Sequence, residues 1–203
     1  GSVDRFVRVF DLYIDEMSGE NALNDFLRWQ MDEGLLYPTS PTGLERLHRI
    51  FRIMVLEGDR SEAVHSRVFD VIDHIVHTVL PMHVADLTLH VLIPMLDAHQ
   101  RMPPYALRRS MLAATRLLRR GKRREVRLIM TKLTQHLITA ADGQREPVLR
   151  ELIISFRHWA ASTDDADPAI VIHSVLLRVF EHDTCAAFRQ MVAEVLTSIR
   201  ADV

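Results

Sequence analysis

The residues best suited to binding a metal ion lie in one segment, where aspartate and histidine recur at helical spacing. Asp70 and His74 are four positions apart, as are Asp73 and His77, so each pair falls on one side of a helix. A stable metal site needs three or four converging ligands, and one helix supplies two of them. All four side chains also lie opposite the apolar positions of the same segment. We therefore interpret them as a solvent-exposed face and predict no metal site and no cofactor.

Residues for nucleophilic or acid–base catalysis form no recognisable constellation. The chain has one cysteine, Cys185, which suits a small buried side chain better than a reactive thiolate. Its sequence contains no glycine-rich phosphate loop, nucleophile elbow or zinc-protease helix. We expect Trp29 and Trp159 to anchor the core or a helix junction rather than to bind a ligand. The sequence therefore predicts that the chain is not an enzyme and has no catalytic residues.

Basic residues are concentrated in the middle of the chain. Residues 101–150 carry 13 basic and 3 acidic side chains, a net charge of +10, whereas residues 1–100 carry −8 and residues 151–203 carry −4. We expect eight of the basic residues on the outer sides of two consecutive helices and their turn. These eight, which we call the basic belt, are Arg109, Arg116, Arg119, Arg120, Lys122, Arg123, Arg124 and Arg127.

The basic belt predicts an acidic partner, because clustered like charges repel one another unless something compensates them. Arginine can bind a carboxylate or a phosphate through two parallel hydrogen bonds. We predict that the belt binds an acidic protein surface or peptide. Nucleic acid is the alternative: a duplex needs phosphate contacts alone, while a single strand would need aromatic platforms, and only Tyr105 is near. The remaining interpretation is that the chain's own acidic segments cover the belt, or that it is a solvated face.

Helix breaks recur at even spacing along the 203 residues. They lie at Gly19, Ser40-Pro41, Asp59, Pro81, Pro103-Pro104, Gly121, Gly143, Asp164 and Asp183. Successive breaks are 18 to 22 positions apart, room for a helix of about four turns and a short connection. Between breaks the apolar residues follow the helical period, as in Val68, Ile72, Ile75 and Val79, and no segment alternates with period two. The sequence predicts an all-α chain of about ten antiparallel helices.

Three local signals predict how particular helices start, end or bend. Asp59 and Glu62 have the spacing of a capping box at a helix start. Gly121 lies where a helix would end in a left-handed residue. Pro94 lies inside the helical pattern of Val84–Ala98 and is expected to kink it, because proline lacks the N–H that the helix needs.

Two consecutive intervals together span 40 to 44 residues, the length of a HEAT or armadillo unit. Two segments resemble the start of a HEAT-type first helix. They are Asp167-Pro168-Ala169-Ile170 followed by Val175-Leu176, and Pro147-Val148-Leu149-Arg150 followed by Leu152-Ile153. The chain thus resembles HEAT and armadillo repeats, a class that includes tubulin-binding TOG domains and the middle domains of translation-initiation scaffolds. It lacks a motif that selects either, and it lacks the recurring aspartate and arginine ladder of regular HEAT arrays.

The resemblance implies helical hairpins stacked into an α-solenoid that serves as a non-enzymatic interaction scaffold. A closed globular helical bundle is the alternative architecture. A homodimerising structural module is the further alternative for function.

For domain organisation, we expect one domain over residues 3–203, a fragment of a larger protein, preceded by Gly1-Ser2, which resembles an expression-tag scar. The single cysteine favours a reducing, intracellular compartment, cytoplasmic or nuclear. The chain has no run of about 18 apolar residues, so we predict no membrane partner.

Overall fold

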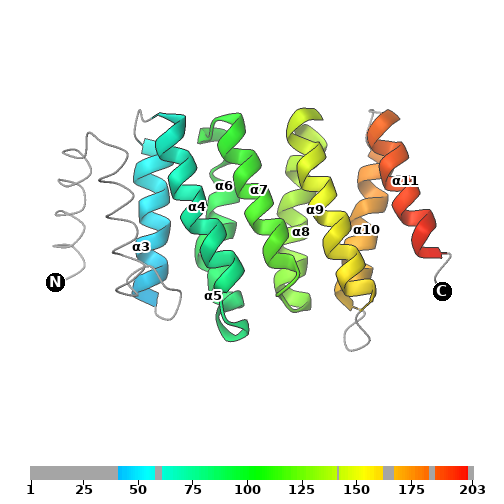
Figure 1. The fold of residues 1–203 in the computed structure, drawn as a ribbon, viewed down its shortest axis with the longest axis horizontal. Coiled ribbons are helices and arrows are strands. Elements are labelled where there is room, and N and C mark those ends of the chain that lie inside the picture. The colour runs from blue at the N-terminus through cyan, green and yellow to red at the C-terminus, as the bar shows by residue number, and fades with distance from the viewer. Residues whose placement is uncertain (1–40, 58–60, 141, 162–166, 183–185, 201–203) are drawn as a thin grey trace. The chain divides into compact units, whose positions relative to one another are not determined.

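The computed structural model describes residues 41–57, 61–140, 142–161, 167–182 and 186–200. Every regular element in these residues is helical, which confirms the all-α prediction (Figure 1). They form about eight helices rather than ten, and the first two predicted intervals, which end at residue 40, lie outside the described residues. The chain divides into two compact units, Gly1–Val79 and Leu80–Val203. The expectation of a single domain over residues 3–203 stays a prediction.

In the first unit, α3 (Pro41–Phe51) continues through a π-helical segment, η1 (Arg52–Glu57), and is followed by α4 (Glu62–Thr78). Phe51 and Phe69 meet edge to face, with ring centroids 6.0 Å apart. The predicted apolar stripe of α4 is buried: Val68, Ile72, Ile75 and Val79.

The start of α4 differs from the predicted capping box. Ser61 is the N-cap, and its side-chain oxygen accepts a hydrogen bond from the Val64 backbone N–H at 3.5 Å. Glu62 is therefore the first residue of the helix and not the third, so it cannot complete a capping box with Asp59. Asp59 itself lies outside the described residues.

The second unit begins with a short 3₁₀ turn, η2 (Pro81–His83), and one continuous helical run. The run comprises α5 (Val84–Leu87), the π-helical η3 (Thr88–Leu92) and α6 (Ile93–Asp97), and a 3₁₀ turn, η4 (His99–Arg101), follows. The Ile93 N–H donates to the carbonyl oxygen of Thr88, one position further back than in an α-helix. The irregularity expected from Pro94 therefore takes the form of a π-helical turn just before it.

Five longer helices complete this unit. They are α7 (Pro104–Leu118), α8 (Arg123–Thr139), α9 (Asp142–Ala160), α10 (Asp167–His182) and α11 (Ala186–Arg200). Gly121 lies between α7 and α8, as predicted, but it does not have the left-handed conformation. The space for a side chain there is tight, because a Cβ atom would come within 3.1 Å of the Glu125 Cβ. The buried stripe expected for α8 is confirmed: Val126, Ile129, Leu133 and Leu137.

The break predicted near Gly143 agrees with the start of α9 at Asp142, but Pro147 does not begin a helix. Gly143 lies in the first turn of the helix, and Pro147 lies in its interior. A helix can include a proline near its start, because only one backbone hydrogen bond, in the second turn, is lost there. The segment that resembles the start of a HEAT-type helix therefore lies inside a helix that begins five residues earlier.

Alternate helices of the second unit lie side by side. The most extensive contacts join α7 to α9 and α8 to α10, and α6 also packs against α8. In Figure 1, α6, α8 and α10 form one row behind a second row containing α7 and α9. Trp159 Nε1 donates to the Leu118 carbonyl oxygen at 3.1 Å, joining positions 41 apart and confirming that this tryptophan anchors a helix junction. This separation is close to the 40 to 44 residues that two consecutive helix intervals span in the sequence.

Candidate interaction surface

The basic belt is not one continuous strip, because its residues belong to helices of different rows. Arg109 and Arg116 lie half-buried on α7, whereas Arg124 and Arg127 are exposed on α8. Arg109, Arg116 and Arg120 each have an interaction partner within the chain. We therefore do not count these three arginines as part of an open binding surface.

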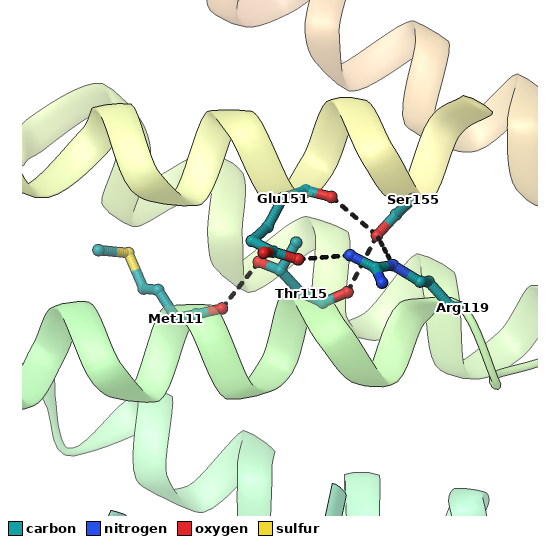
Figure 2. Close-up of polar contacts among 5 residues, drawn as sticks. All are labelled: Met111, Thr115, Arg119, Glu151 and Ser155. Atoms are coloured by element: carbon teal, nitrogen blue, oxygen red, sulfur yellow. Dashed lines mark hydrogen bonds and ion pairs between the residues drawn. The ribbon is translucent and has the colours of Figure 1, made fainter. Parts of the chain in front are cut away.

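Arg119 joins α7 to α9 (Figure 2). Its guanidinium forms an ion pair with the carboxylate of Glu151, and its Nε donates to Ser155 Oγ at 3.4 Å. The buried Ser155 hydroxyl lies 3.2 Å from the Thr115 carbonyl oxygen and 2.9 Å from that of Glu151. Thr115 in turn donates to the Met111 carbonyl oxygen at 2.8 Å. Arg119 therefore contributes to the packing of α7 on α9, and its charge is compensated there.

Arg123 is also paired within the chain. Its guanidinium lies 2.7 Å from an oxygen of Asp167, and both side chains are about half exposed. Arg123 is the first residue of α8 and Asp167 the first of α10, so the pair shows that the N-termini of the two helices lie at one level. An exposed pair of this kind contributes at most about 1 kcal/mol to stability.

Three belt residues remain exposed without an acidic partner in the described part of the chain. They are Lys122, Arg124 and Arg127, and we call them the α8 cluster. The only carboxylate in residues 101–140, that of Glu125, is buried and accepts the backbone N–H of Lys122 at 2.8 Å. The cluster also lies at the positive end of the α8 dipole, where cations are unfavourable and an anion is stabilised. The electrostatics of this turn therefore favour an acidic ligand.

Sequence reasoning missed the apolar side chains beside the α8 cluster. Ile138 on α8 and Ile170 and Leu177 on α10 are exposed. On α10 the buried stripe runs through Ile172 and Val179, and Ile170 and Leu177 fall on the opposite side. The sequence signal that could have found them is an apolar residue that lies off the main apolar stripe of its helix, as Ile170 and Leu177 do on α10.

The aspartates and histidines of α4 do not form a metal site. Val68 and Ile72 are buried, while Asp70, His74 and His77 are exposed, which confirms the interpretation as a surface face for these three; Asp73 is half-buried. Within the described ranges, no three histidine, cysteine, aspartate or glutamate side chains are placed to hold a metal ion. Cys185 and Trp29 lie outside those ranges.

Two imidazoles meet where η4 packs near α8. The ring centroids of His99 and His136 are 4.3 Å apart, and His136 is buried. Burial lowers the pKa of His136, and His99 and Lys132 lower it further, against the opposing effects of the Leu96 carbonyl and Asp97. Burial, followed by the charge of Arg52, also lowers the pKa of His48 in the first unit.

In the part of the chain that the structure describes, no helix has the length and apolar character needed to span a bilayer. In comparisons with protein-family models, with curated proteins and with solved structures, none of the three finds a match to this chain.

Proposed function

We propose that this chain is a non-enzymatic, intracellular interaction module that binds an acidic protein surface or peptide through the α8 cluster. The observation that carries the proposal is the exposure of Lys122, Arg124 and Arg127 together, with no acidic partner among the described residues. The cluster adds its charge to that of the helix N-terminus, so a carboxylate bound there is stabilised by both.

For architecture, we propose a HEAT- or armadillo-like α-solenoid of stacked helical hairpins. The contacts between alternate helices support it, because they recur at sequence separations of 32 to 44 positions, close to the length of one helical hairpin. Thr115 contacts Ser155 at 40 positions, Trp159 reaches Leu118 at 41, and Arg123 pairs with Asp167 at 44. A repeat array produces this pattern because each helix packs on its equivalent in the next unit.

An acidic protein is favoured over nucleic acid by the composition of the surface. The exposed apolar side chains of this face are aliphatic, with Ile170 near the cluster and Ile138 further along α8, and α8 and α10 carry no tryptophan or tyrosine and one phenylalanine, Phe180, which is half-buried. Single-stranded nucleic acid relies on aromatic stacking, and aliphatic side chains gain little against a phosphate backbone.

The proposal is tested by fluorescence anisotropy with a labelled oligoglutamate and a labelled DNA duplex at the same ionic strength. We expect Arg124→Glu/Arg127→Glu to weaken oligoglutamate binding by at least about tenfold. The matched control is Arg101→Glu/Arg157→Glu, which makes the same charge change at exposed positions on η4 and α9 and should retain binding.

Two outcomes would overturn the proposal. Equal binding by the two double variants would show that the α8 cluster is not the site. Binding of the duplex alone would favour the nucleic-acid function instead.

A further inference from the structure

Beside the α8 cluster lies an exposed aliphatic surface. Ile170 is 61% exposed, Ile138 is 45% exposed and Leu177 is 37% exposed. A single exposed isoleucine is ordinary in a soluble protein. Three exposed aliphatic residues on two helices that pack together are more informative, because they combine into one surface.

The register of α8 against α10 places this surface next to the cations. The Arg123–Asp167 pair sets positions 44 apart at the same level, so Arg127 lies level with the first turn of α10, beside Ile170. Near the C-terminal end of the same helix, α8, Ile138 lies level with the last turn of α10, beyond Leu177. The cations therefore occupy one end of the two-helix face and the aliphatic side chains extend along it.

Two residues between these side chains, Thr131 and Ser174, are short and hydrogen-bond within their own helices, whereas Gln135 on α8 and Glu181 on α10 are longer and exposed. The hydroxyl of Thr131 donates to the Arg127 carbonyl oxygen and that of Ser174 donates to the Ile170 carbonyl oxygen, each at 2.8 Å. Both hydroxyl protons are used within their own helices. At these two positions the face therefore leaves no hydroxyl donor that a partner would have to satisfy.

We propose that this α8–α10 face binds an acidic amphipathic helix, an inference that rests on the proposed function and names its partner class. Ile170 and Leu177 are seven positions apart, about 10.5 Å along α10 at 1.5 Å per residue, which is also the i to i+7 spacing on a partner helix. Carboxylates of the partner meet Arg124 and Arg127, and its apolar face covers the aliphatic side chains.

Charge favours an acidic partner over a second copy of this chain. In a dimer that brings the two clusters together, the cations of one copy approach those of the other. An acidic partner removes that repulsion, and a partner with an apolar face also covers the aliphatic side chains.

The test compares two labelled probes of equal net charge. One is an amphipathic peptide with glutamates on one face and leucines at i, i+3, i+4 and i+7, and the other is oligoglutamate. The wild-type protein should bind the amphipathic peptide about tenfold more tightly or better. Ile170→Ser/Leu177→Ser should bind the two probes with equal affinity, because oligoglutamate binding stays unchanged and only the amphipathic peptide binds more weakly. Ile154→Ser/Met82→Ser is the matched control, since these side chains are 46% and 75% exposed at other places in the unit.

The outcomes separate this inference from the proposed function. If Ile170→Ser/Leu177→Ser still binds the amphipathic peptide more tightly than oligoglutamate by the wild-type factor, the inference is overturned while the proposed function stands. The same holds if the wild-type protein binds the two probes equally. If the wild-type protein binds neither probe, both are overturned. Circular dichroism of each variant verifies the fold, and substitutions at exposed positions should not alter it.

Discussion

Arg119 and Arg124 show how five positions separate a structural arginine from an exposed one. Arg119 directly follows α7, beside Glu151 and Ser155, and its charge is compensated in the junction with α9. Arg124 lies on the outer side of α8, in the other row, where no described acidic residue pairs with it. The charge count along the sequence treats the two alike, and only the register between helices distinguishes them.

Arg119→Ala should lower the free energy of unfolding by about 1–2 kcal/mol, because Glu151 and Ser155 lose a partner in a partly buried junction. Urea denaturation followed by circular dichroism measures the change. Arg124→Ala is the matched control and should stay within about 0.5 kcal/mol of the wild-type protein. Equal stability of the two variants would contradict the structural role of Arg119.

The lowered pKa of His136 predicts a loss of stability in mild acid. The unfolded chain takes up a proton near the ordinary histidine pKa of 6.5, while the folded chain resists it until a lower pH. The free energy of unfolding should therefore fall as the pH drops through and below about 6.5.

Substitution identifies the source of this pH dependence. His136→Gln should reduce the slope of the free energy of unfolding between about pH 7 and pH 5, and His48→Gln/His136→Gln should reduce it further. Denaturant titrations across this range measure the slope. An unchanged slope in His136→Gln would refute the assignment.

At the scale of the element, the sequence predicts what depends on local periodicity. The buried stripes of α4 and α8 follow from apolar spacing alone, and Pro81 and Pro104 mark real helix boundaries. Contacts between alternate helices, such as Arg119 with Glu151, are not local, so no spacing rule within one helix reveals them. The exposed Ile170 was assigned to an apolar start motif because the motif ignores which side of the helix packs.

Pro147 is the clearest local misassignment and supports a prediction about α9. Because it lies inside the helix, Pro147→Ala should restore a backbone hydrogen bond and raise the free energy of unfolding by about 1 kcal/mol or more. Pro104→Ala is the control, since Pro104 is the first residue of α7 and its missing N–H has no helical partner to lose. A fall in stability of Pro147→Ala, measured by urea denaturation, would contradict the placement of this proline.

At the scale of the whole molecule, the proposed α-solenoid predicts how the chain tolerates truncation. In a repeat array each unit contacts only its neighbours, and the strongest contacts of α11 are with α10. A chain ending at His182 should therefore keep cooperative unfolding and the helical signal of its remaining residues, at reduced stability. In a closed bundle the same truncation opens the shared core. Thermal unfolding by circular dichroism distinguishes the two, and loss of the cooperative transition would favour the bundle.

The central claim is that an acidic partner binds the exposed cations at the start of α8 and the adjoining face of α10. Backbone amide shifts in heteronuclear NMR spectra, recorded while the acidic amphipathic peptide is titrated, locate the site directly. We predict that the largest shifts fall on residues 122–127 and 170–177. Shifts concentrated on α9, or none at saturating peptide, would contradict the account.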